Sequence, residues 1–173
     1  KLIESKIPNY KWFGQSDTET LLASFEIFGI KETLIQTEGM FAFALWDKKK
    51  NELILARDRM GEKPMYYGWV KNNFIFSSEL KSIKEYPGFN NNLSNKALSN
   101  FFQFSYIQSP LSIYENIFKL KPGSMLKIKK KDEYIPQNIE TLSQEKNDIS
   151  LSDWWPLSDT YNKKFIFDEC YKS

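Results

Sequence analysis

The sequence contains no histidine and only one cysteine among its 173 residues. Without histidine, the chain by itself excludes Ser-His-Asp and Cys-His catalysis and any zinc site that needs imidazole. Its single thiol, Cys170, excludes an internal disulfide and is typical of a protein in a reducing cytoplasm, which is the expected location. If the protein hydrolyses a substrate, its general base must be something other than histidine.

Long apolar runs and a strong charge imbalance are also missing. No stretch is apolar enough to span a bilayer and no secretory signal opens the chain, so no membrane partner is expected. Lys and Arg total 24 against 22 Asp and Glu, a balance that predicts no nucleic-acid partner. The hydrophobic share of 41% is sufficient for one domain with a real core.

Residues 39–68, GMFAFALWDKKKNELILARDRMGEKPMYYG, organise the rest of the chain. Two apolar runs, 41–46 and 52–57, are separated by a polar turn, which predicts a β-hairpin. Two more runs, 65–70 and 74–78, each follow a polar loop. We expect these four strands to form one antiparallel meander with a buried aromatic face.

Helix signals flank these strands. The sequence Ser16-Asp17-Thr18-Glu19 is a capping box, in which Ser16 accepts from first-turn amides and Glu19 reaches back to the cap; Gly29 is placed to end the helix. Further helices are predicted over 31–37 and 79–84 and after Ser94. Together with the strands, these helices indicate an α+β fold.

The character of the chain changes near residue 129. Residues 129–152 are polar with no apolar period, which is typical of a linker. Residues 154–157 (WWPL) are a small apolar anchor that we expect to dock against another part of the protein. The predicted division is a domain over 1–128 and a connector over 129–173.

Three segments, EGMFAFALWD, LARDRMGEKPMYY and FSSELKSI, closely resemble the glutaminase domain of glutamine-hydrolysing asparagine synthetases. That domain is a class II glutamine amidotransferase. The resemblance runs from Ser16 to Gly123 and implies an N-terminal-nucleophile (Ntn) hydrolase fold, an antiparallel sheet sandwich flanked by helices. Both ends of the family's usual chain are missing, so the fold is expected to be incomplete and the chain to be a piece of a longer one.

The resemblance also implies an activity for the parent protein. It would hydrolyse glutamine and use the ammonia for ATP-dependent amidation of aspartate in a C-terminal synthetase domain of the same chain. No cofactor is expected on residues 1–173, whereas ATP and magnesium are implied for that absent domain. The implied partners are glutamine and the synthetase domain, with a homodimer left open.

Asp17 has two interpretations. An acidic residue in the first turn of a helix interacts favourably with the helix dipole, by roughly 0.3–1 kcal/mol, which suffices as a structural role. The resemblance, however, places the aspartate of the family's SDxE motif against the α-ammonium of glutamine. We therefore predict that Asp17 binds substrate, and that Ser16, Thr18 and Glu19 are structural.

The charged loop 57–63 also has two interpretations. The residue types alone predict an Arg–Asp ion-pair network that braces a turn. They do not favour a phosphate-binding loop, because only Gly61 could allow the close backbone approach that a phosphate needs. The resemblance makes the loop a family signature that supports the glutamine pocket or the domain interface. The residues given this role are Arg57, Asp58, Arg59, Gly61 and Lys63. Gly39 is predicted to occupy a position that a side chain would obstruct.

No catalytic residue is predicted on this chain. The resemblance implies an N-terminal cysteine nucleophile, an arginine that binds the glutamine carboxylate, and an oxyanion hole, all of which precede residue 1. Losing one oxyanion donor costs on the order of 10²–10³ in rate, so residues 1–173 alone are expected to be inactive. Cys170 is expected to be a passive thiol, and Glu79 a helix-start carboxylate rather than a general base.

Two alternatives stay open. The first is a sister amidotransferase in which the same domain feeds another acceptor, such as a sugar acid. The second is a non-catalytic remnant that binds glutamine or a partner protein. A Met-Cys start and an SGGxDS segment in the native product would exclude the remnant.

Overall fold

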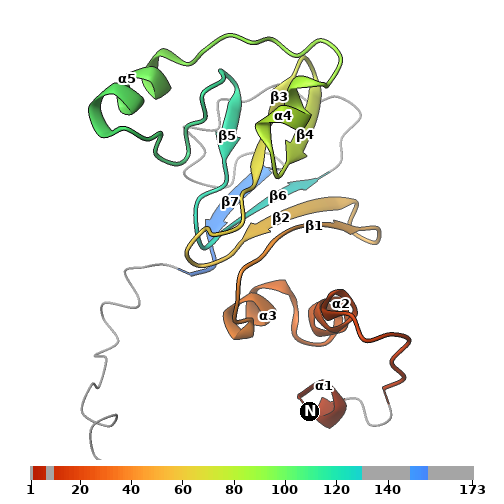
Figure 1. Ribbon diagram of the computed structural model, residues 1–173. Helices are drawn as coiled ribbons and strands as arrows, with labels where there is room; N and C mark the ends of the chain where they lie inside the picture. Colours follow the sequence, from red (N-terminus) through yellow and green to blue (C-terminus); the bar gives the residue numbers. More distant parts are fainter. Residues whose placement is uncertain (1, 7–9, 130–148, 156–173) are drawn as a thin grey trace, which may run out of the picture. The chain divides into compact units, whose positions relative to one another are not determined.

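The structure is a computed structural model that describes residues 2–6, 10–129 and 149–155. The chain divides into two compact units, Lys1–Gly39 and Met40–Ser173 (Figure 1). The described residues of the first unit form helices, and those of the second form two antiparallel sheets and two further helices.

The N-terminal unit begins its main helix where the sequence predicts. Ser16 caps it, because its Oγ accepts a hydrogen bond from the amide of Thr18 at 3.1 Å. Gly29, with a φ of +82°, ends this helix and precedes the next. The helices of the unit are α1 (Leu2–Lys6), α2 (Asp17–Phe28) and α3 (Ile30–Gln36).

Glu19 does not complete the capping box in the predicted way. Its carboxylate oxygens accept hydrogen bonds from the amides of Phe13 at 2.8 Å and Gly14 at 2.9 Å, both upstream of the cap. The chain before Ser16 turns back toward the first turn of α2 and brings these two amides to the carboxylate. The prediction of a Glu19 bond to the cap amide is therefore wrong, although the structural role of Glu19 is confirmed.

The larger sheet, sheet A, contains the predicted hairpin. In the turn, Asp47 Oδ1 accepts hydrogen bonds from the amides of Lys49 at 2.9 Å and Lys50 at 3.0 Å, and Asn51 adopts a left-handed φ of +50°. The strand order is β1-β2-β6-β7 with every pair antiparallel. Its strands are β1 (Ala42–Asp47), β2 (Glu52–Arg57), β6 (Ser124–Lys129) and β7 (Ile149–Asp153).

The smaller sheet, sheet B, has the order β4-β3-β5, again antiparallel. Its strands are β3 (Tyr66–Val70), β4 (Asn73–Ser77) and β5 (Ile117–Lys119). The prediction of one four-stranded meander is therefore wrong. Strand β2 pairs with β1 on one edge and with β6 on the other, so no edge of β2 is free for β3. The loop after β2 therefore carries the chain into a second sheet.

Strand β7 corrects the expected connector. Ile149 and Leu151 stand opposite Ile128 and Leu126 of β6, so five residues of the predicted connector, four of them in the predicted linker, extend sheet A. The linker interpretation is wrong for these residues because the Ile-x-Leu alternation is too short to stand out within a polar stretch. Residues 130–148 and 156–173 of the expected connector lie outside the described residues.

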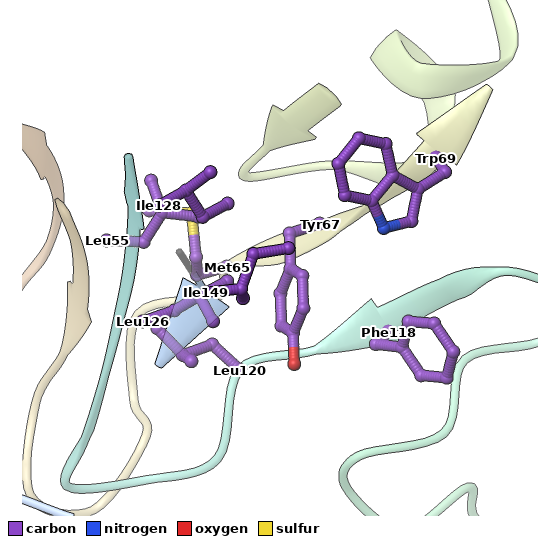
Figure 2. Packing of buried hydrophobic residues seen from close by; sticks show 9 residues of the cluster. All are labelled: Leu55, Met65, Tyr67, Trp69, Phe118, Leu120, Leu126, Ile128 and Ile149. Atoms are coloured by element: carbon purple, nitrogen blue, oxygen red, sulfur yellow. The ribbon is translucent and has the colours of Figure 1, made fainter. Parts of the chain in front are cut away.

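The hydrophobic core lies between the two sheets. Side chains from β2, β6 and β7 of sheet A meet side chains from β3, β5 and their flanking residues (Figure 2). Fully burying one such side chain contributes roughly 1.5–3 kcal/mol. The buried members are Leu55, Met65, Tyr67, Trp69, Phe118, Leu120, Leu126, Ile128 and Ile149. The expected buried aromatic face is thus an interface between two sheets.

Two helices lie between β4 and β5 in the sequence. Helix α4 (Leu80–Lys84) has the exposed residue Glu79 at its N-cap position, and it buries Ile83 against sheet B residues. Helix α5 (Asn95–Phe104) is capped by Ser94, whose Oγ accepts from the amide of Ala97 at 3.3 Å. The positions of both helix starts confirm the sequence prediction.

Gly68 permits the close approach of β3 and β5, and Gly68→Ala is expected to lower the free energy of unfolding by about 1–3 kcal/mol or more. A Cβ at Gly68 would lie 2.0 Å from the carbonyl oxygen of Asn116. That oxygen accepts a hydrogen bond from the amide of Trp69 at 3.2 Å, so relief requires the strands to separate. Urea unfolding measures the effect. Gly14→Ala is the control, since its Cβ would meet no described heavy atom closer than 3.5 Å; equal losses would contradict the prediction.

Candidate functional site

Asp17 is the first residue of α2, and its carboxylate is exposed. Its Oδ1 accepts hydrogen bonds from the hydroxyls of Ser16 and Thr18, each at 3.5 Å. The capped helix start fixes the backbone at this point, so the carboxylate has limited freedom to move. An exposed carboxylate on an ordered backbone can bind a cationic group such as an ammonium ion.

Asp58, in contrast, is a buried carboxylate with a structural set of partners. Its side chain is only 1% exposed. Oδ1 accepts from the amides of Met60 at 3.1 Å and Glu62 at 3.0 Å, and Oδ2 accepts from the amide of Lys63 at 3.0 Å. One side chain therefore satisfies three backbone donors and holds the 57–63 loop in a single shape.

The protonation of Asp58 reflects two opposing effects. Burial disfavours the charged form, but hydrogen bonds from the amides of Lys63, Glu62 and neighbouring residues hold the pKa of the Asp58 carboxyl below its ordinary value. The group is thus an anion at neutral pH. It is already saturated by donors within the loop, so it cannot act as a general base for a substrate.

Arg57 ties the same loop to Leu120, which directly follows β5 of sheet B. Its guanidinium donates to three carbonyl oxygens, through Nε to Lys63 at 2.7 Å, Nη1 to Leu120 at 2.6 Å and Nη2 to Gly61 at 2.5 Å. The hydrogen bonds of Arg57 and Asp58 go to backbone groups. The prediction of an Arg–Asp ion-pair network is therefore wrong for these two residues.

Trp154 lies against the base of the 57–63 loop. Its ring is 1% exposed, stacks on Phe41 with centroids 5.8 Å apart, and donates through Nε1 to the carbonyl of Arg57 at 3.1 Å. The amides of Trp154 and Trp155 both donate to the carbonyl of Gly123, at 2.9 and 3.1 Å. The predicted apolar anchor is confirmed for Trp154. Pro156 and Leu157, its other expected members, lie outside the described residues.

Arg59 extends this contact. Its guanidinium carbon lies 4.4 Å from the ring centroid of Trp155 and 5.5 Å from that of Trp154, within the range of cation–π attraction. The loop is consequently held from one side by β5 through Leu120 and from the other by the residues after β7. The charged groups of Arg57, Asp58 and Arg59 are thus used to hold the loop in place.

The structure gives a different reason for glycine at position 61 than at position 39. Gly61 has a φ of +69°, and a Cβ there would lie 2.8 Å from Pro122 Cγ and 3.1 Å from Arg57 Cζ, so both the backbone conformation and the close neighbours favour glycine. Gly39 has a φ of +117°, but a Cβ would meet no described heavy atom within 4 Å. The requirement at Gly39 is its backbone conformation, and the predicted obstruction is wrong.

The predicted site residues fall in both units. Asp17 and Gly39 belong to the first unit, whereas the loop residues Arg57, Asp58, Arg59, Gly61 and Lys63 belong to the second. Within the second unit, the structure brings Trp154 and Gly123 to the loop. The sequence predicted that Trp154 docks but not where, and it gave no sign of the role of Gly123. The Pro122-Gly123 turn was visible in the sequence, but nothing local indicates which segment it faces.

Cys170 lies outside the described residues. Across residues 2–6, 10–129 and 149–155, no three Cys, Asp or Glu side chains converge in a way that could hold a metal ion. Within the same ranges, no helix has the length and apolar character needed to cross a membrane.

Comparisons with known proteins agree with this architecture. The family described as glutamine amidotransferase domain matches residues 3–138. A protein of Methanocaldococcus jannaschii, provisionally named asparagine synthetase (glutamine-hydrolysing) 2, is 36% identical over 159 residues, which cover 89% of this chain and 28% of the relative. Asparagine synthetase (glutamine-hydrolysing) 3 of Bacillus subtilis is 36% identical over 116 residues, which cover 66% and 19%.

A solved structure supports the fold. The glutamine phosphoribosylpyrophosphate amidotransferase of B. subtilis aligns with a TM-score of 0.51 and 19% identity, over 88% of this chain and 25% of that one. At this identity the likeness shows the fold alone: the α+β Ntn-type amidotransferase arrangement, with two antiparallel sheets and helices. The chain spans only about a quarter of the length of the proteins it matches.

Proposed function

This chain belongs to the family of glutamine amidotransferase domains, and from that premise we propose that it is the glutamine-binding part of an asparagine synthetase. In the parent protein, this domain would take part in hydrolysing glutamine, and the ammonia would amidate aspartate at the expense of ATP. The observation that carries the proposal is the similarity, over most of the chain, to proteins named as glutamine-hydrolysing asparagine synthetases.

The structure supports a division of labour within the domain. Asp17, exposed at the capped start of α2, is proposed to bind the α-ammonium of glutamine. The loop residues Arg57, Asp58, Arg59, Gly61 and Lys63 are proposed to support the pocket or the domain interface without touching the reacting atoms. The hydrogen bonds of Asp58 and Arg57 to backbone groups favour that supporting role.

We propose the same division of the chain as the sequence suggests, with one amendment. The glutaminase domain includes β7 as well as residues 1–128, because β7 completes sheet A. The remaining residues after 155 would lead toward the synthetase domain. ATP and magnesium are proposed to act in that other domain, as the family resemblance implies.

Residues 1–173 by themselves are proposed to lack glutaminase activity. Their single thiol, Cys170, has no histidine anywhere in the chain to activate it. The non-catalytic alternative and the synthetase proposal differ in the native product. A product several-fold heavier than 20.5 kDa that begins with a free cysteine supports the synthetase, and a product of this mass supports the remnant.

Asp17→Asn in the full-length protein is expected to raise the KM for glutamine about tenfold or more, because a hydrogen bond to a charged group contributes about 1.5–3 kcal/mol. Asparagine formation driven by ammonia should not change, since ammonia bypasses glutamine binding. Steady-state kinetics with each nitrogen source, at saturating aspartate and ATP, measure both effects.

Glu26→Gln is the matched control. Glu26 is an exposed carboxylate on the same helix, so its replacement removes an equal charge from α2 without changing the capped start. An unchanged glutamine KM in Asp17→Asn, or an equal rise in Glu26→Gln, would contradict the role of Asp17. Failure of both nitrogen sources to amidate aspartate in the wild type would instead indicate another acceptor.

A further inference from the structure

Lys119 is a half-buried lysine at the end of β5. Its neighbour Phe118 belongs to the core between the sheets, whereas Ile117 packs with Tyr66 on the other face of sheet B. Because successive side chains of a strand point to opposite faces, Lys119 shares that second face with Ile117. The strand register places Lys119 directly opposite Tyr66 of β3. The sheet thus fixes where the lysine leaves the backbone and on which face it lies.

The ammonium group of Lys119 keeps most of its hydrogen-bonding capacity. Its Nζ donates to the carbonyl oxygen of Ile107 at 2.7 Å, which holds the side chain against the segment before β5. An ammonium group has three donors and no acceptor. After this bond to Ile107, two donors remain for a ligand.

A second cation lies close to this ammonium group. Arg57 donates to the carbonyl oxygen of Leu120, the residue after Lys119, at 2.6 Å. Burial and the Arg57 guanidinium both lower the pKa of the Lys119 ammonium. Among the described residues, no carboxylate raises the pKa of Lys119. Asp58 does act on Arg57, but its own oxygens accept from three amides of the 57–63 loop.

These groups leave one positive charge without a counter-ion. The charges of Arg57 and Asp58 balance each other, so the charge of Lys119 is the excess. A partly buried charge is stabilised by a partner of opposite sign. A carboxylate carries one negative charge and only accepts hydrogen bonds, so it matches both the excess charge and the unused donors of Lys119.

We propose that Lys119, together with the neighbouring guanidinium of Arg57, forms a binding site for a carboxylate group. The carboxylate belongs either to a free small acid or to an acidic side chain in the remainder of the parent protein, and the chemistry of recognition is the same for both. The inference does not depend on glutamine hydrolysis, and the site is separate from Asp17.

An NMR titration of the ¹⁵N-labelled 173-residue chain with acetate, at constant ionic strength, tests the site. We expect saturable shifts of the amide signals of Ile107, Lys119 and Leu120. Acetamide has a similar shape without the charge and should cause no such shifts. Equal shifts with acetamide, or no saturable shift with acetate, would overturn the proposal.

Lys119→Gln removes the charge but keeps a donor for the carbonyl of Ile107, and the spectrum of the variant shows whether it folds. The dissociation constant for acetate should rise about tenfold, because a hydrogen bond to a charged group is lost. Lys121→Gln is the matched control, since Lys121 is an exposed lysine two positions further along the chain. An unchanged affinity in Lys119→Gln, or an equal loss in Lys121→Gln, would contradict the role of Lys119.

The same titration of the full-length protein distinguishes the two sources of the carboxylate. An acidic side chain of the parent protein would occupy the site and exclude acetate, whereas a free small acid would leave the site open to acetate. Either result supports the site, provided that acetate binds to the 173-residue chain through Lys119.

Discussion

Replacing Asp58 with alanine is expected to lower the free energy of unfolding by about 3–5 kcal/mol, a loss comparable to breaking a buried charged pair. The substitution leaves the amides of Met60, Glu62 and Lys63 without their acceptor in a loop whose carboxylate is almost fully buried. Each buried donor without a partner costs about 1–3 kcal/mol. Urea unfolding at neutral pH, followed by circular dichroism, measures the loss.

Asp58→Asn is the variant to compare with Asp58→Ala. The amide keeps one oxygen acceptor but places an NH₂ group near one of the backbone donors, so its loss should be smaller than that of alanine. A loss below about 1 kcal/mol in Asp58→Ala would show that the loop relaxes into another shape, and the structural role given to Asp58 would be wrong.

The stability of these variants should also depend differently on pH. The pKa of Asp58 is lower in the folded chain, because amide hydrogen bonds outweigh the effect of burial. A carboxylate of this kind contributes stability that is fully present above its unfolded pKa of about 4 and is lost as pH falls through the lower folded value. The wild type should therefore lose stability more steeply than Asp58→Asn below about pH 4, and parallel curves would contradict this.

Trp154→Ala is the second substitution with a large expected effect, a loss of about 3–5 kcal/mol in the free energy of unfolding. The ring is buried, stacks on Phe41 and donates to the carbonyl of Arg57, so its removal leaves a cavity and an unpaired acceptor. It also removes one of the two rings beside Arg59. Urea unfolding measures the loss of stability.

Trp154→Phe separates the contributions of Trp154. Phenylalanine keeps a ring against Phe41 but cannot donate to Arg57, so we expect a loss of about 1–2 kcal/mol. Trp46→Ala is the control, because Trp46 is 43% exposed on β1 and should cost less. If Trp154→Ala is no more destabilising than Trp46→Ala, then Trp154 does not anchor the end of β7.

The sequence by itself determined the features that depend on near neighbours. The hairpin of β1 and β2 follows from two apolar runs around a polar turn, and Ser16 and Ser94 mark helix starts through contacts two or three residues away. The family resemblance followed from three short segments, and the family match confirmed it. These features can be predicted because the contacts that cause them join residues close together in the sequence.

Only the tertiary structure decided how distant segments combine. The guanidinium of Arg57 reaches a carbonyl 63 positions away, and Trp154 donates to a carbonyl 97 positions away, distances at which periodicity gives no information. The same holds for the division of the predicted meander into two sheets, since β2 pairs with β6 rather than with β3. Strand pairing depends on which edge is free and which faces can be buried together, and these are properties of the assembled chain.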